Sequence, residues 1–323
     1  MKTKFAAAIL LAAAMFLPQS AQAGRLGTDI IGLFPKDVGE LAYADLKTAR
    51  KQKWFPQMKE QMLPSRFRQF EQFLASAGID PNTQVEELAW AASLVTGTGG
   101  EQIVGVALGQ FQPKVAEEYF KAQKLPVAEH RGFTLFAFGS GVGPNDIFFL
   151  FLDSNTAAFG HRQLLEKMLE VRFGAEEGLL RNDRMFPLVN DVNGRGVIWA
   201  VLNKDYTRLA FAQLIPEAAQ FPEAAQLIAR IQAMTLSIEA ERGLQAQFQA
   251  VCDTPDDANI FAALLQAAVM LRRSVETERN PDLAKLLEEM RVNPRGERLE
   301  LRVGVTEEQL LALLKRNTFA VKL

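Results

Sequence analysis

Residues 235–250 read Thr-Leu-Ser-Ile-Glu-Ala-Glu-Arg-Gly-Leu-Gln-Ala-Gln-Phe-Gln-Ala, and this stretch decides the fold class. Apolar and polar residues alternate on both sides of a turn at Arg242-Gly243. Before the turn, the pattern directs Leu236, Ile238 and Ala240 inward, and Ser237, Glu239 and Glu241 outward. A period of two that is interrupted by a turn predicts two antiparallel strands, with one face in the core and the other in water.

The segments around this hairpin continue an alternation of strands and helices. A strand is predicted at 196–202. Thr254-Pro255 then begins a helix that runs to about Val275, because Thr caps a helix and Pro suits its first turn. A last strand at 298–303 precedes a capping box at 306–309, which opens a final helix.

The first half of the chain shows the same order of elements. Strands are predicted at 41–46, 85–95, 102–111, 133–138, 147–153 and 156–160, and helices at 54–77, 113–123 and 162–171. Because both halves run strand, helix, two paired strands, helix, strand, helix, we infer an internal duplication. The expected fold is α+β, with two similar βαββαβ-type (ferredoxin-like) halves that contain antiparallel sheets and added helices.

The amino-terminal residues have the three parts of a secretory signal peptide. Met1–Lys4 is positively charged, 5–17 is a short apolar run, and 21–23 offers small residues for cleavage. We therefore expect an exported protein, periplasmic or extracellular, with no transmembrane segment after cleavage. The expected division of the chain is 1–23 signal peptide, 24–175 first α+β half, 176–193 connector and 194–323 second α+β half.

The composition describes a folded chain with a mildly acidic balance. With 323 residues, 48% hydrophobic residues and a net charge of −2, the chain can bury a large core. It lacks the basic excess that is typical of a nucleic-acid-binding domain. Cys252 is the only cysteine, so the fold has no internal disulfide, and the strand-like run before it predicts a buried thiol.

Several turns and strand starts form a recognisable set. They are Leu33-Phe34-Pro35 with Tyr43 and Asp45, the segment 78–88, the segment 153–160 with the helix after it, and Trp199 after Gly196. This set resembles a group of exported bacterial proteins of unknown function. The resemblance covers most of the chain after residue 23 and implies a fold and a compartment. Because that group has no agreed activity, the resemblance implies no catalytic residue.

The residue types that carry catalysis are scarce. His130 and His161 are the only histidines, and neither has another His or Cys at the spacing of a metal site. The glycine-rich loop 139–143 precedes a strand, whereas a nucleophile elbow or a phosphate-binding loop precedes a helix. We expect no cofactor, no metal and no catalytic residue. A hydrolase with a dispersed site at His161 or His130 is an open alternative.

One basic segment is a candidate binding surface. Between residues 47 and 68 the chain carries seven basic residues and one acid, with aromatic residues and Met interleaved. This pattern suits an anionic membrane or an acidic partner, whereas the alternative is a helix pair whose apolar stripe belongs to the core. The candidate binding residues are Lys51, Lys53, Trp54, Lys59, Arg66 and Arg68.

The strands at 133–138 and 147–153 are apolar on both faces. Burial within the protein explains this pattern more simply than an exposed binding face does. We predict a non-catalytic binding or interaction protein of the cell envelope, whose protein or lipid partner contacts the region 47–73 or this sheet. A carrier of a hydrophobic ligand held between the halves and the dispersed-site hydrolase are the alternatives.

Overall fold

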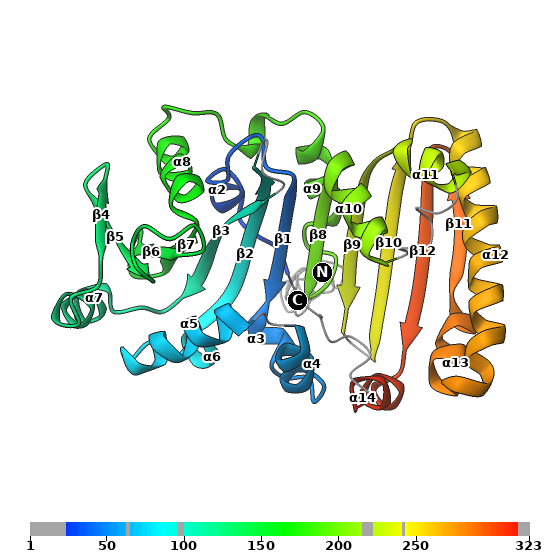
Figure 1. Ribbon diagram of the computed structural model, residues 1–323, viewed down its shortest axis with the longest axis horizontal. Helices are drawn as coiled ribbons and strands as arrows, with labels where there is room; N and C mark the ends of the chain where they lie inside the picture. Colours follow the sequence, from blue (N-terminus) through cyan, green and yellow to red (C-terminus); the bar gives the residue numbers. More distant parts are fainter. Residues whose placement is uncertain (1–23, 63–64, 96–99, 215–221, 241–242, 316–323) are drawn as a thin grey trace, which may run out of the picture.

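The computed structural model describes residues 24–62, 65–95, 100–214, 222–240 and 243–315 (Figure 1). The predicted signal peptide, 1–23, lies outside the described residues, and its cleavage stays a prediction. The strands form one 12-stranded sheet in the order β11-β12-β10-β9-β8-β1-β2-β3-β7-β6-β5-β4. Every neighbouring pair is antiparallel. Helices pack on both faces, which confirms the α+β class.

The first half contributes the strands on one side of the sheet. Its strands are β1 (Glu40–Asp45), β2 (Val85–Leu94), β3 (Glu101–Gly109), β4 (Val127–His130), β5 (Phe133–Phe138), β6 (Ile147–Phe151) and β7 (Thr156–Gly160). Its helices are α2 (Thr28–Ile31), α3 (Leu46–Ala49), α4 (Phe55–Met62), α5 (Ser65–Ser76), α6 (Pro81–Gln84), α7 (Pro113–Ala122) and α8 (Arg162–Arg172). A 3-10 helix, η1 (Leu179–Arg181), and α9 (Met185–Val192) follow.

The second half continues the same sheet. Its strands are β8 (Ile198–Asn203), β9 (Ile231–Glu239), β10 (Leu244–Cys252), β11 (Arg291–Arg295) and β12 (Arg298–Val305). Its helices are α10 (Lys204–Leu214), α11 (Pro222–Ala229), α12 (Pro255–Arg279), α13 (Pro281–Glu289) and α14 (Glu307–Lys315). The predicted strands and helices of both halves are thus found near their expected positions.

The arrangement of the two halves differs from the expectation in two ways. They share one continuous sheet instead of separate sheets, because β1 pairs with β8 from Glu40–Leu202 to Ala44–Ile198. A ferredoxin-like unit places its first strand between later strands, whereas β1 and β8 each pair with the strand that follows them. The pairing order β1-β2-β3-β7-β6 corresponds to β8-β9-β10-β12-β11. The duplication and the domain boundaries stay predictions.

One face of the sheet, here called the Tyr43 face, carries the largest core cluster. Helices α2, α8, η1 and α9 pack on it. Across the β1–β8 pair, Tyr43 stacks on Trp199 with ring centroids 5.4 Å apart. The Tyr43 hydroxyl donates to Glu87 at 2.8 Å, and the Trp199 Nε1–H donates to the Gly24 carbonyl at 3.1 Å. Both rings are buried with their polar atoms bonded, as buried aromatic residues require.

The predicted connector, 176–193, belongs to this core. Met185 and Val189 of α9 are buried, and the helix contacts β8 and β9. This contact corrects the prediction that Ser237 faces water. Ser237 is buried, because it lies beside Trp199 in register, on the face that α9 covers. Beyond α9, the Tyr43 face carries exposed Gln245 and Arg302, as the alternation predicts, whereas Glu300 is buried and pairs with Arg302.

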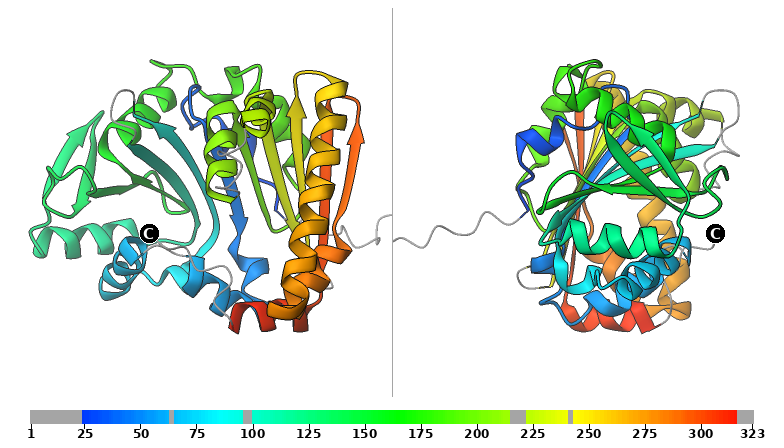
Figure 2. Two further views of the ribbon diagram at one scale, coloured as in Figure 1. Left: turned by 45° about the vertical axis from the view of Figure 1, so that its right-hand side comes forward. Right: turned by 90° about the vertical axis from the view of Figure 1, so that its left-hand side faces the viewer.

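The opposite face, here called the Ala42 face, is covered by different helices in the two halves. In the first half, α5 and α7 contribute to a cluster rich in phenylalanine: Phe70, Phe73, Phe120, Phe136 and Phe149. In the second half, α10 and α12 contribute to a separate cluster against β9, β10 and β12. Figure 2 shows α12 running in front of these last strands. Gly105 lets the Phe159 ring lie on the sheet, because a Cβ there would be 2.3 Å from that ring.

We predict that Phe149→Ala lowers the free energy of unfolding by about 3–5 kcal/mol, because it removes a buried ring from the phenylalanine cluster. Denaturant titration followed by circular dichroism measures the change. Val142→Ala is the control, because Val142 is 91% exposed, and it should shift stability by less than about 0.5 kcal/mol. Equal effects of the two substitutions would contradict the packing described above.

Candidate functional site

Some basic residues of the predicted surface pair with acids from other segments. Lys53 lies 3.2 Å from Glu307 of α14, and Lys59 lies 2.7 Å from Glu71 of α5. Arg68 donates to a backbone carbonyl of α4 at 3.1 Å. The Lys51 side chain is exposed, and that of Arg66 lies outside the described residues. Because paired surface charges contribute little net field, these ion pairs weaken the attraction of this segment for an anionic partner.

Trp54 is placed differently from the prediction. Its ring is 1% exposed and packs in a cluster with Val197, Leu244, Leu310 and Leu314, which joins α4 and α14 to the sheet. A surface partner therefore does not reach this ring. The interleaved aromatic pattern reflects a helix pair whose apolar side belongs to the core, which was the alternative interpretation of the segment.

The strands at 133–138 and 147–153 are covered on both faces. Leu135 and Leu150 lie in the cluster beneath α8, and Phe136 and Phe149 lie in the cluster beneath α5 and α7. The prediction of burial within the protein is confirmed. These strands offer no exposed face to a partner.

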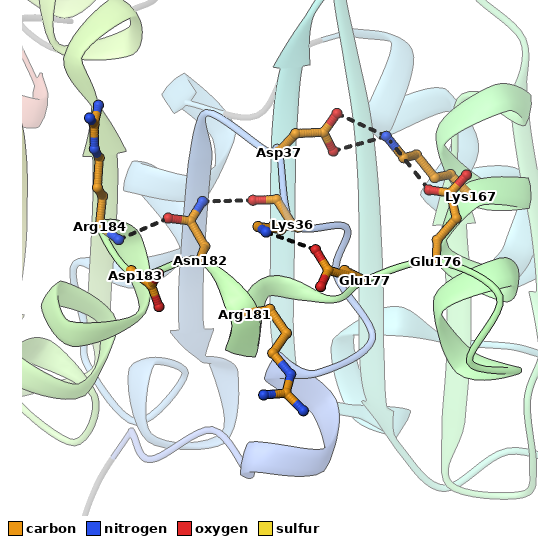
Figure 3. A pocket seen from close by; sticks show the side chains of 9 residues that line it. All are labelled: Lys36, Asp37, Lys167, Glu176, Glu177, Arg181, Asn182, Asp183 and Arg184. Atoms are coloured by element: carbon orange, nitrogen blue, oxygen red, sulfur yellow. Dashed lines mark hydrogen bonds and ion pairs between the residues drawn. The ribbon is translucent and has the colours of Figure 1, made fainter.

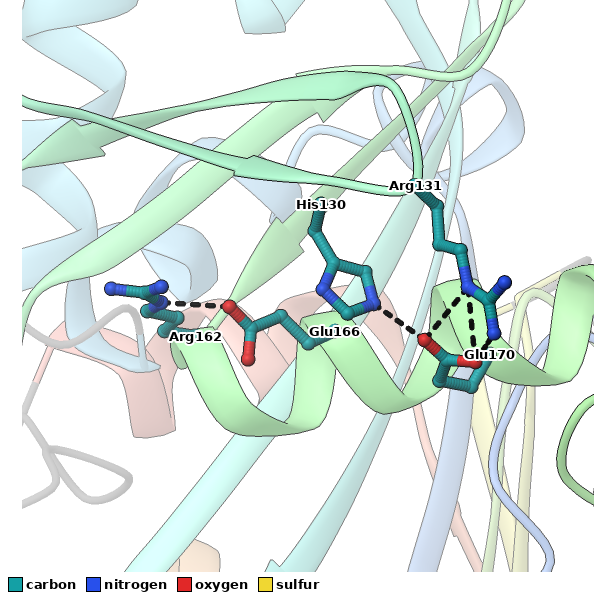
Figure 4. Close-up of polar contacts among 5 residues, drawn as sticks. All are labelled: His130, Arg131, Arg162, Glu166 and Glu170. Carbon is teal, nitrogen blue, oxygen red and sulfur yellow. Dashed lines mark hydrogen bonds and ion pairs between the residues drawn. The ribbon is translucent and has the colours of Figure 1, made fainter.

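Both histidines are bonded to parts of the fold. His130 Nε2 lies 2.7 Å from a Glu170 carboxylate oxygen of α8, and the neighbouring Arg131 also binds Glu170 (Figure 4). Arg131, at φ 49°, and Gly132 form the tight turn between β4 and β5, so these contacts fasten the hairpin tip to α8. His161 Nδ1 accepts from the backbone N–H of Ile103 at 3.0 Å. The hydrolase alternative stays a prediction. Among the described residues, the hydrogen bonds of the two imidazoles go to Glu170 and to the backbone of Ile103.

A polar pocket lies where the loop after α2 meets the connector. It has a volume of about 520 Å³ and is lined by Lys36, Asp37, Lys167, Glu176, Glu177, Arg181, Asn182, Asp183 and Arg184 (Figure 3). Lys36 pairs with Glu177 at 2.7 Å, and Lys167 pairs with Asp37 at 2.8 Å. The two arginines point in opposite directions in Figure 3. The ion pairs of the pocket therefore connect the loop after α2 to the connector and to α8. Arg181 and Arg184 do not point toward a common position where they could bind one anion.

Within the described residues, no group of three His, Cys, Asp or Glu side chains is arranged to hold a metal ion. Cys252 is buried, and burial raises the pKa of its thiol to about 11, which confirms the predicted buried thiol. In the part of the chain that the structure covers, no helix has the length and apolar character needed to cross a bilayer.

Helix α12 presents a surface that the sequence analysis did not identify. The helix begins at the predicted cap, where the Thr254 hydroxyl accepts from the Asp257 N–H at 3.1 Å. Arg230 contacts the Asp257 carboxylate at 2.7 Å, and its hydrogen bond is the main reason that the pKa of Asp257 is lowered. At the other end, Arg273 lies 3.1 Å from Glu288 of α13. These contacts connect the 25-residue helix to neighbouring elements at the outer end of the sheet, on the right in Figure 1.

Two opposite sides of α12 are apolar. The inner side contains Ala258 and Ala262, which are buried against β10 and β12. The outer side is exposed along its length: Ile260 is 48% exposed, Leu264 45%, Leu271 69% and Val275 45%. Met270, which is 71% exposed, lies on the flank, about 100° around the helix from Leu271. We call Ile260, Leu264, Ala267, Ala268, Leu271 and Val275 the outer stripe. An apolar helix stripe in water typically marks a site of interaction with another apolar surface.

The sequence carried one signal for this stripe. Residues 258–271 contain no charged residue, and a helical projection of this stretch is apolar almost all round, with Asn259 and Gln266 as its polar residues. A helix that packs on one sheet needs only one apolar side. The additional apolar residues of this stretch therefore indicate a second apolar surface, which a binding partner can cover.

Glu40 on β1 provides a test of the electrostatics of the Ala42 face. Burial and the nearby Glu101 raise the pKa of its carboxyl to about 7, against a smaller lowering by the Trp90 side chain. The folded protein therefore keeps this proton to about pH 7, whereas the unfolded chain releases it near pH 4.5, the ordinary pKa of a Glu carboxyl. Because the folded state binds more protons in this window, this carboxyl makes stability fall as the pH rises from about 4.5 to 7.

We predict that Glu40→Gln raises the free energy of unfolding by about 1–3 kcal/mol at pH 8 and changes it little at pH 4.5, because Gln does not ionise. Thermal unfolding at both pH values measures the difference. Glu118→Gln, on the exposed side of α7, is the matched control and should leave the pH dependence unchanged. A Glu40→Gln variant whose stability follows the parent chain at both pH values would refute the raised pKa.

Comparisons with known proteins extend the description of the fold. No family model and no curated protein matches this sequence. The chain is similar to a solved structure titled "Structure of crystal form I of TP0453", with a TM-score of 0.50 and 11% sequence identity. The similarity covers 92% of this chain and 100% of that chain. At this identity the likeness concerns the fold alone, so the chain shares its overall architecture with a solved protein over nearly its whole length.

Proposed function

We propose that this chain is an exported, non-catalytic interaction protein of the cell envelope, and that it binds an apolar helix through the outer stripe of α12. The features of residues 1–23 support export. The observation that carries the interaction is the exposure of large aliphatic side chains in a row along one helix. The resemblance to exported bacterial proteins of unknown function is consistent with this proposal.

Burial of the outer stripe by a partner helix is energetically favourable. Complete burial of a large aliphatic side chain contributes about 1.5–3 kcal/mol relative to its exposure to water. Ile260, Leu264, Leu271 and Val275 are each about half exposed or more, so a partner helix that covers them gains several such contributions. The alternatives considered above, the basic segment and the first-half sheet, present paired charges and buried side chains respectively.

A carrier of a hydrophobic ligand stays a prediction with less support. The pocket at Lys36 is lined by charged side chains, and a second pocket is lined by Thr83, Gln84, Glu86, Gln110, Phe111 and Gln112. A lipid chain requires an apolar lining, which neither of these two pockets provides.

We predict that a photo-activated cross-linking amino acid at Leu271 captures a protein in the envelope fraction of the host cell, because this side chain is 69% exposed on the outer stripe. The adduct is measured by its mass shift on a denaturing gel and identified by mass spectrometry. The same amino acid at Val115, an exposed apolar position on α7, is the matched control and should give no adduct.

The cross-linking result can contradict the proposal in two ways. Recovery of the chain only from the cytoplasm would contradict the proposed export. The absence of a protein adduct with the cross-linking amino acid at Leu264 and at Leu271 would contradict the proposed interaction site.

A further inference from the structure

The outer stripe of α12 has the same order of large and small side chains from either end. Its midpoint lies between Ala267 and Ala268. Leu264 and Leu271 stand at equal distances on the two sides of this midpoint, and so do Ile260 and Val275. A helix of this kind matches a second copy of itself when the two run in opposite directions, because large residues meet large residues about a two-fold axis.

The centre of the stripe is suited to a close helix contact. Ala267 and Ala268 are exposed and small, so a second helix can approach the α12 backbone there, between the larger side chains of Leu264 and Leu271. Packed helices lie about 8–10 Å apart, and small residues at the crossing point favour the shorter distance. The stripe from Ile260 to Val275 is about 22 Å long at 1.5 Å per residue, which is long enough for four turns of contact.

The charges at the ends of α12 favour the antiparallel direction. Asp256 is exposed in the first turn, and Arg279 is exposed in the last. In an antiparallel pair, each Asp256 lies at the end that carries the other copy's Arg279, and the two helix dipoles oppose each other. A parallel pair would instead place the two Asp256 side chains at one end and the two Arg279 side chains at the other, and these like charges repel each other.

We propose that the partner of the outer stripe is a second copy of this chain, bound through an antiparallel α12–α12 contact with a two-fold axis near Ala267–Ala268. This inference rests on the proposed function, since it names the occupant of the same stripe. An anionic membrane fits the stripe less well, because helices that lie on membranes carry Lys and Arg along their polar flanks. Residues 258–271 have no charged residue, and Arg272 pairs with Glu276 at 3.0 Å.

The size of the contact determines the expected affinity. A standard protein interface buries about 800 Å² on each partner, and a contact through one helix stripe lies at the lower end of the range. We therefore expect a reversible dimer that dissociates in the micromolar concentration range. Sedimentation velocity of the purified protein, measured over a series of concentrations, gives the dissociation constant.

Leu271→Glu should weaken the dimer at least tenfold, because it brings carboxylates into the apolar contact. Val115→Glu is the matched control and should dimerise as the parent chain does. Circular dichroism spectra and melting curves that match those of the parent establish that the Leu271→Glu variant is folded. A protein that stays monomeric up to a concentration of about 100 micromolar would overturn the proposal. A dimer whose dissociation constant is unaffected by Leu271→Glu would also overturn it.

Cross-linking between single introduced cysteines tests the direction of the pair. With a short bismaleimide reagent, Ala267→Cys should link to its own copy, whereas Ile260→Cys should link only to Val275→Cys in a mixture of the two variants. Two copies of residue 260 are about 22 Å apart in the antiparallel pair and adjacent in a parallel one. Efficient linking of Ile260→Cys to itself would overturn the antiparallel arrangement. The parent chain, whose Cys252 is buried, is the unlinked control.

These outcomes are separate from the test of the proposed function. If the purified protein is monomeric but Leu271 captures a different protein in the envelope, the self-association is refuted and the interaction function stands. If the captured protein is this chain itself, both are supported.

Discussion

The hydrogen bonds between β1 and β8 join two groups of strands into one sheet, and the rest of the molecule depends on this pairing. Each of these strands would otherwise be the edge of its own half. An unpaired edge exposes backbone donors and acceptors and invites association with other chains. The stacked rings of Tyr43 and Trp199 cover the junction on one face, and α9 packs beside them. The connector between the halves therefore acts as part of the core, and the two halves have a common interior.

This long sheet explains why α12 has two apolar sides. The last strands of the second half need a cover on the Ala42 face, and the inner side of α12, with Ala258 and Ala262, provides it. Since α12 lies at the end of the sheet, no further element of the described chain packs on its outer side. The exposed stripe is thus a consequence of position: the same helix placed centrally, under another layer, would have had both sides buried.

The charged groups elsewhere are consistent with the proposed binding surface on α12. Basic residues of the segment 47–68, the pocket at Lys36 and the hairpin tip at Arg131 each contact carboxylates from distant parts of the chain. Exposed ion pairs contribute little to stability individually, but they leave a surface with small local excesses of charge. These ion pairs weaken recognition by charge, whereas α12 exposes a row of apolar side chains.

The local features of this protein were determined by its sequence. The strands of the 235–250 hairpin, the cap of α12 at Thr254, the α+β class and the burial of Phe136 and Phe149 all follow from periodicity and turn chemistry, which act between residues close in the chain. The tertiary structure alone decided which apolar sides are covered. Trp54 and Leu271 both lie in apolar helical patterns, yet one is in the core and the other is in water. Ser237 is buried because α9 returns over it. Such outcomes depend on which elements meet across the sheet, and strand pairing such as that of β1 with β8 has no local signature in the sequence.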